Sequence, residues 1–265
     1  MEGRITQPRA TLVTFGISHF CEKARWALDW HGIAYEEISW PPGVHRILAK
    51  RCGAKCTTLP IVLEGKTVIQ GSGAIIDWAE SKARDRNRSL TPQSNQAEIH
   101  EIEWRADEVI GVHVRRLAYA EMLPSCSHLL KPTLFHRVSG WNHLVGSMMW
   151  PMARRIMIQM YNVTPEAALE SRSKLEGELD WLDGKLADGR PYLVGDRFSR
   201  ADLTVASLLA LFARPKEMPM VHEMSGRDTF VADVERWRER PVMRWVIAQY
   251  QTHRVPRCEA QAAAA

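Results

Sequence analysis

The sequence has few cysteines, and this excludes two classes of structure. Five cysteines in 265 residues are too few and too scattered for a disulfide framework. Cys52 and Cys56 lie four residues apart, but no further Cys or His pair stands at the spacing that would complete a zinc site. The sequence therefore predicts no metal site, and it favours a reducing compartment.

Long apolar stretches are also missing. The longest weakly charged window, residues 138–153, contains Gly140, Asn142, His143, Gly146 and Pro151, and is too short to span a bilayer. The opening residues lead into a polar segment with no apolar core of the kind that a secretory signal requires. We expect no membrane partner and a cytoplasmic location.

No run of one charge sign stands out either. The chain has 35 Lys and Arg against 31 Asp and Glu, a net charge of +4, and no cluster of cations long enough for a nucleic-acid track. Its 45% hydrophobic and 25% charged residues are ordinary for a globular protein with a substantial core. The length allows one large domain or two modest ones.

The first part of the chain alternates between β-prone runs and helical patterns. Strands are predicted at 12–15, 34–39, 57–63 and 67–69, and helices at 20–31, at 44–51 and from Ser72 onward. The order β-α-β-α-β-β-α is that of a thioredoxin-like α/β domain, which we place at residues 10–84. Leu59-Pro60 stands at the start of a strand, where this fold has a cis-proline.

Beyond a charged, turn-rich linker at 84–92, the pattern is helical without a convincing strand. Helices are predicted at 97–122, at 133–162 with a break near Pro151, at 165–186, at 203–212, and at 230–250 with an interruption near Pro241. Pro124 and Pro132 should interrupt the chain between the first two. Ser199 with Asp202 three residues later resembles a capping box. These helices predict an all-α bundle domain at residues 97–252.

The stretch from Ser18 to Leu28 carries the chemistry. A short β-prone run precedes it, and small or apolar side chains at helical spacing follow it, so Ser18 stands where a strand ends and a helix begins. A serine there caps free N–H groups, and the helix dipole favours an anion at that end. Cys21, three residues on, is the other candidate reactive group.

These residues resemble a known family. A small polar or thiol residue, two intervening residues and Cys form the thioredoxin and glutaredoxin arrangement, and S-x-F-C-x-K-x-R is similar to the first strand–helix unit of cytosolic glutathione transferases. Leu59-Pro60, Ser72 and the segment from Tyr192 to Asp202 add to the resemblance. It covers residues 10–84 well and 165–212 fairly, and implies a thioredoxin-like domain followed by a helical bundle.

The resemblance also implies roles and partners. Glutathione would be the co-substrate, with Ser18 activating its thiol, the Leu59 main chain holding its cysteinyl part, Pro60 shaping that backbone, and Ser72 holding its γ-glutamyl carboxylate. Many members have Glu or Gln directly before this serine, whereas this chain has Gly71 there and Gln70 one residue earlier. Gln70 would then reach the γ-glutamyl amine. Members of the family are homodimers.

The second substrate would be a small apolar electrophile bound between the domains. His113, Tyr119 and Met122 on the long helix are candidate lining residues, each with ordinary packing as the alternative. The Trp- and Met-rich residues 141–160 fit a pocket wall, a core or a dimer contact equally well.

Three functions remain open at this point. The first is a transferase in which a thiolate stabilised by Ser18 attacks the electrophile, whether by conjugation, dehalogenation or ether cleavage. The second is a thiol transferase or reductase that uses Cys21 through a mixed disulfide with glutathione. The third is a non-catalytic binding protein of the same fold.

Overall fold

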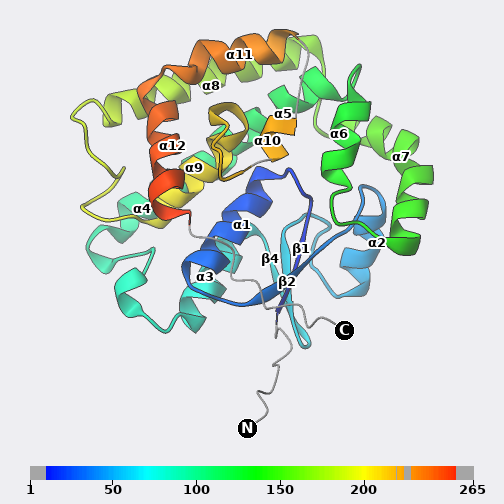
Figure 1. The fold of residues 1–265 in the computed structure, drawn as a ribbon, viewed down its shortest axis with the longest axis horizontal. Helices are drawn as coiled ribbons and strands as arrows, with labels where there is room; N and C mark the ends of the chain where they lie inside the picture. Colours follow the sequence, from blue (N-terminus) through cyan, green and yellow to red (C-terminus); the bar gives the residue numbers. More distant parts are fainter. Residues whose placement is uncertain (1–9, 219, 224–227, 255–265) are drawn as a thin grey trace.

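The computed structural model describes residues 10–218, 220–223 and 228–254, and its N-terminal part contains a four-stranded sheet (Figure 1). The strands are β1 (Ala10–Thr14), β2 (Tyr35–Ser39), β3 (Ile61–Glu64) and β4 (Thr67–Gln70). Their order is β2-β1-β3-β4, with β1 and β2 parallel and the other pairs antiparallel. Along the chain the strands and helices follow the predicted thioredoxin-like order β-α-β-α-β-β-α, but the strand predicted at 57–63 begins only at Ile61.

Three helices cover the two faces of this sheet: α1 (His19–Trp30), α2 (Val44–Arg51) and α3 (Ser72–Lys82). Leu12 packs with side chains of α1 and α3, whereas its neighbour Val13 packs with Trp40 and with Ala49 of α2. Successive side chains of a strand point to opposite faces, so α1 and α3 lie on one side and α2 on the other.

The rest of the described chain is helical. Its elements are η1 (Arg86–Arg88), η2 (Gln93–Asn95), α4 (Gln96–Arg105), η3 (Ala106–Ile110), α5 (Gly111–Met122), α6 (Ser127–Leu134), α7 (Gly140–Met160), α8 (Pro165–Lys185), α9 (Arg200–Ala213), α10 (Met220–Glu223), α11 (Asp228–Arg238) and α12 (Pro241–His253). Helix α9 is buried along its whole length and contacts α1, α4 and α12. The predicted combination of an α/β domain with a helical bundle is confirmed.

Local sequence signals fix the N-terminus of the buried helix α9. Ser199 and Asp202 form the predicted capping box, in which Asp202 accepts hydrogen bonds from the main-chain N–H and the hydroxyl of Ser199, both at 2.8 Å. Asp202 also accepts from the N–H of Leu193 at 2.7 Å, which joins the preceding loop to the helix.

The predictions for prolines and for the long helix need correction. Helix α7 runs through Pro151 without the expected break, because the burial of its Trp150, Ala153 and Met157 side offsets the cost of about 3 kcal/mol for a proline inside a helix. Pro132 likewise lies inside α6, and the helix predicted at 133–162 is not continuous, because α6 ends at Leu134 and α7 begins at Gly140. The predicted helix at 97–122 contains the π-helical turn η3, whereas the interruption near Pro241 is where predicted, between α11 and α12.

Candidate functional site

The Ser18 hydroxyl lies at the N-terminus of α1, as predicted. Its oxygen accepts a hydrogen bond from the main-chain N–H of Cys21 at 3.4 Å, and Ser18 has the extended backbone of an N-cap residue. Among the residues described, no acceptor is found for the Ser18 O–H. The hydroxyl is half-buried and therefore able to donate to an anion at the helix terminus.

Arg25 fixes the loop that carries Ser18. Its Nη2 donates to the carbonyl oxygens of Phe15 and Gly16 at 3.2 and 3.1 Å, and its Nε donates to Glu37 at 2.7 Å. Arg25 is buried, and it supports the fold rather than facing a ligand.

The strand register brings five more predicted residues to the same end of the sheet. Val13 near the end of β1 is paired with Ile61 at the start of β3, and Ile61 is paired with Gln70 at the end of β4. Leu59-Pro60 directly precedes β3, and its peptide bond is cis as predicted. Gly71 and Ser72 directly follow β4.

Ser72 is the first residue of α3 rather than its cap. The N-cap is Gly71, whose positive φ of 94° favours glycine and whose N–H donates to the Pro60 carbonyl at 3.0 Å. Among the residues that the structure describes, no side chain caps α3 by a hydrogen bond, so the Ser72 hydroxyl and the N–H groups of the first turn remain for an anion.

The Gln70 side chain forms hydrogen bonds within the protein. Its amide nitrogen donates to the carbonyl oxygens of Cys56 and Thr58 at 2.8 and 2.9 Å, and its amide oxygen accepts from the Cys56 N–H at 3.0 Å. Gln70 therefore shapes the loop that leads into Leu59-Pro60, and its amide is already hydrogen-bonded on both sides.

The Cys21 thiol is fully buried on the inner side of α1. Burial raises its pKa, and this outweighs the opposing effects of Arg25 and of the hydrogen bond with Ser18. A thiol in this state has little thiolate and no access to a disulfide partner.

Two small cavities meet at Tyr119, where the two parts of the chain join. The first is lined by Ser18, Arg115 and Tyr119 together with Ile17, His19, Ala118, Leu130 and Leu211. The second is mostly apolar and lies between the loop before α2 and helix α7, with Phe15, Arg46 and Ile156 in its wall. Of the candidate lining residues, Tyr119 faces both cavities, whereas Met122 is core and His113 bonds the Ser171 hydroxyl at 3.0 Å.

Arg115 is a site residue that the sequence pattern did not single out. Its guanidinium lies 4.6 Å from the ring centre of Tyr161, and its buried Nε has no hydrogen-bond partner among the described residues. Arg115 and burial together lower the pKa of His19 to about 3, burial being the larger cause. His19 is therefore neutral, and its Nε2 donates to the Gly111 carbonyl at 3.0 Å.

A buried ionic cluster fixes α1 and α3 against the helical part. Lys23 on α1 donates to Glu103 at 2.9 Å and to both oxygens of Asp107 in the π-helical turn, at 2.9 and 2.8 Å. Arg200 on α9 binds Glu103 at 3.0 Å and Asp77 on α3 at 2.6 Å. Both helices whose N-termini face the candidate site are thus held by residues of the second part of the chain.

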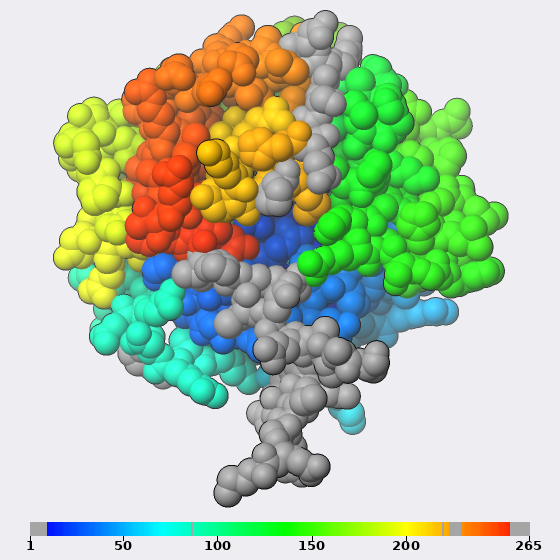
Figure 2. Space-filling model, in the orientation of Figure 1, coloured from blue at the N-terminus to red at the C-terminus, as the bar shows by residue number. Residues whose placement is uncertain are grey.

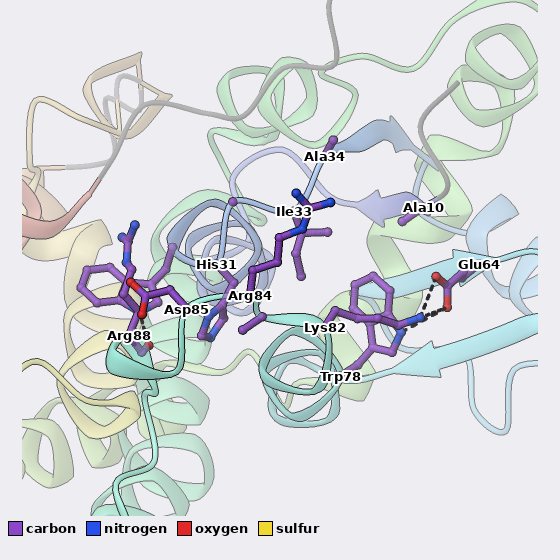
Figure 3. A pocket seen from close by; sticks show the side chains of 13 residues that line it. Ala10, His31, Ile33, Ala34, Glu64, Trp78, Lys82, Arg84, Asp85 and Arg88 are labelled. Carbon is purple, nitrogen blue, oxygen red and sulfur yellow. Dashed lines mark hydrogen bonds and ion pairs between the residues drawn. The ribbon is translucent and has the colours of Figure 1, made fainter. Parts of the chain in front are cut away.

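A separate hollow lies near the C-terminal ends of α1 and α3 (Figure 3). Trp78 and Lys82 form part of its wall, and Lys82 pairs with Glu64 at 3.1 Å. It contains none of the predicted site residues. Among the residues that the structure describes, no group of three His, Cys, Asp or Glu side chains is arranged to hold a metal ion.

Comparison with protein families gives two matches in chain order. Residues 12–87 match the glutathione S-transferase N-terminal domain, and residues 145–240 match the glutathione S-transferase C-terminal domain. Together the matched residues make up more than half of the chain. No curated protein matches the chain significantly in sequence.

Solved structures of similar fold cover nearly the whole chain. A glutathione transferase from Phanerochaete chrysosporium is 18% identical with a TM-score of 0.67, over 95% of this chain and 99% of its own. A glutathione S-transferase from Ceriporiopsis subvermispora, solved in complex with glutathione, is 18% identical with a TM-score of 0.64, over 94% and 98%. The beta-etherase LigF from Sphingobium is 19% identical with a TM-score of 0.57, over 91% and 99%.

Proposed function

Because the chain belongs to the glutathione S-transferase family, we propose that it activates the thiol of glutathione for attack on a small apolar electrophile. The observation that carries this proposal is the Ser18 hydroxyl, which caps α1 beside a cavity that also contains Arg115. A hydroxyl, a helix N-terminus and a guanidinium all stabilise a thiolate over a thiol.

Glutathione would lie along the end of the sheet. Its γ-glutamyl carboxylate would bind the first turn of α3, where the Ser72 hydroxyl and main-chain N–H groups are free. The main chain of Leu59, next to the cis peptide bond with Pro60, would hold the cysteinyl part.

The sulfur would then rest at Ser18. The thiol proton leaves to solvent, and the thiolate accepts the hydrogen bond that the Ser18 O–H has available. The electrophile occupies the apolar cavity beside Tyr119, and the sulfur forms the new C–S bond while the displaced halide or alkoxide leaves, or while an activated double bond takes up the electron pair. Conjugation, dehalogenation and ether cleavage share this step, and one protein of similar fold is a beta-etherase.

The buried Cys21 favours Ser18 as the active group over the thiol transferase alternative. As part of the same proposal, the protein acts as a homodimer in a reducing, cytoplasmic setting. The described cysteines, Cys21, Cys52, Cys56 and Cys126, are free thiols.

Calorimetry with glutathione tests the proposal on the wild type and two serine variants. Ser72→Ala removes a hydrogen bond to a charged group and should weaken binding by about tenfold or more. Ser81→Ala is the matched control, because Ser81 is exposed at the other end of the same helix and donates to the Trp78 carbonyl. Undetectable binding by the folded wild type at millimolar glutathione would contradict a transferase and favour a non-catalytic binding protein.

Turnover of a chromogenic aryl halide then separates the two enzymatic alternatives. We expect Cys21→Ala to retain most activity and Ser18→Ala to lose at least tenfold in kcat/KM. The opposite result would assign the reaction to the Cys21 thiol.

A further inference from the structure

The positive charge of this protein is unevenly distributed. Residues 38–63 and 122–165 contain eight Lys and Arg and no Asp or Glu. The rest of the chain has 27 Lys and Arg against all 31 Asp and Glu, a net charge of −4. The net charge of +4 therefore resides entirely in these two stretches.

The two stretches pack against each other, although they are far apart in sequence. Helix α2 of the first contacts helix α7 of the second, and Gly43 lies against the side chains of Met149 and Ala153. Gly146 on α7 lies closer still to the Pro41 ring. Figure 1 shows α2 beside α7, and in Figure 2 the green residues of α6 and α7 form one side of the molecule above the light-blue ones.

The cations of this side are exposed and largely without partners. Arg46, Lys50 and Arg51 on α2, Lys55 in the following loop, and Arg155 on α7 are all exposed, and no ion pair joins any of them to a described residue. Elsewhere in the same stretches Arg137 pairs with Glu37, and Arg154 binds the carbonyl oxygens of Leu123 and Pro124.

Helix α7 adds a row of exposed apolar side chains. These are Trp141, Leu144, Met148, Met152, Ile156 and Met160, each between 39% and 76% exposed. From Leu144 onward they recur every four residues, so they form one continuous ridge along the helix surface. Single exposed apolar residues are common, but a contiguous row of this length marks an interaction surface.

We propose that this α2–α7 face, made of the five free cations and the six apolar side chains above, docks on a lipid surface with anionic headgroups. A bilayer presents negative charge beside acyl chains, and it therefore matches both components. Nucleic acid would use the cations but leave the apolar ridge in water, and a second copy of the face would oppose like charges. No described helix is long and apolar enough to cross a membrane.

The apolar cavity opens within this face, between Arg46 on α2 and Ile156 and Met160 on α7. An apolar electrophile dissolved in the bilayer would then reach the cavity without first entering bulk water. This consequence rests on the proposed function, whereas the docking itself does not.

Vesicle sedimentation with the full chain tests the docking. The wild type should bind phosphatidylcholine vesicles that contain phosphatidylglycerol at least tenfold more tightly than vesicles without it, and added salt should weaken binding. Met148→Glu with Met152→Glu should reduce binding at least tenfold. Trp104→Glu with Val231→Glu is the matched control, since it adds the same charge at residues 65% and 43% exposed on α4 and α11.

A second pair, Lys50→Ser with Arg51→Ser, tests the charges separately, and thermal melts establish that each variant is folded. Equal binding by the ridge and control variants would overturn the proposal, as would absence of wild-type binding to the anionic vesicles. Sedimentation velocity showing a dimer that only the ridge variant disrupts would assign the face to a second copy instead. Tighter binding to polyglutamate than to the vesicles would assign it to an acidic protein.

Discussion

Replacing Lys23 with methionine should destabilise the protein more than any exposed charge change. The Lys23 ammonium is fully buried and contacts Glu103 and both oxygens of Asp107, so it joins α1 to the long helix of the second part. Methionine fills a similar volume without the charge. Two carboxylates would then face a site that held a cation.

The loss of stability in Lys23→Met depends on whether each of the two carboxylates, Glu103 and Asp107, still has a positively charged partner. Glu103 retains Arg200 at 3.0 Å, whereas Lys23 is the only cation that an ion pair joins to Asp107 among the described residues. Removing one partner of a buried ion pair costs about 3–5 kcal/mol, because the other charge is left without compensation, and the 25% exposure of the Asp107 side chain places this case at the lower end of that range. Burial already raises the pKa of Asp107, so this carboxyl should protonate in the variant and the cost should fall as the pH is lowered.

Urea unfolding near neutral pH measures this cost. Lys23→Met should lower the free energy of unfolding by about 3 kcal/mol, and Lys23→Met with Asp107→Asn should recover on the order of half of the loss. Lys174→Met, at an exposed pair with Glu170, is the control and should leave stability unchanged. A loss below about 1 kcal/mol for Lys23→Met would refute the argument that this cluster holds the two parts together.

Four further changes test other parts of the site. His19 has a folded-state pKa near 3 against an ordinary value of 6.5, so the unfolded chain binds the extra proton and stability falls as the pH drops below 6.5. At pH 5 this effect lowers the unfolding free energy of the wild type by about 2 kcal/mol. In His19→Gln this contribution should be absent, so that its unfolding free energy should depend less steeply on pH. Arg115→Met should raise the pKa of bound glutathione, whereas Arg116→Met, one residue on, should not, and equal effects would exclude Arg115 from the site. Native Cys21 should resist alkylation until the protein unfolds, and labelling at the rate of the exposed Cys56 would contradict its burial. Gln70→Ala should weaken glutathione binding several-fold by loosening the loop from Cys56 to Thr58, and unchanged affinity would show that the loop holds its shape without the amide.

Local sequence rules predicted the first part of the fold well because its elements are short and bounded by strong signals. The N-cap at Ser18 acts over a few residues, and most strands and helices of this part lie close to where they were predicted. The strand predicted at 57–63 is the exception, because it begins only at Ile61. The capping box at Ser199 is equally local and is also present.

Tertiary packing decided the features that the sequence pattern misjudged. Pro151 breaks an isolated helix, but α7 is held by its buried side, and nothing in the apolar spacing of 97–122 marks the π-helical turn at 106–110. Arg115 and Arg116 are the same residue type in adjacent positions, and only the fold distinguishes them. Arg115 lines the cavity beside Ser18, whereas Arg116 donates to the Tyr161 carbonyl. Gln70 satisfies its amide through a loop that lies 12 to 14 residues earlier, and this pairing exists only in the folded chain.

The measurement that tests the account most directly is the pKa of the glutathione thiol when bound. Thiolate absorbance titrated with pH, in the wild type and in Ser18→Ala, reports it without any assumption about the electrophile. A hydrogen bond to a charged group contributes about 1.5–3 kcal/mol, so the variant should raise this pKa by about 1–2 units. Identical titration curves for the two proteins, both saturated with glutathione, would contradict the role of Ser18.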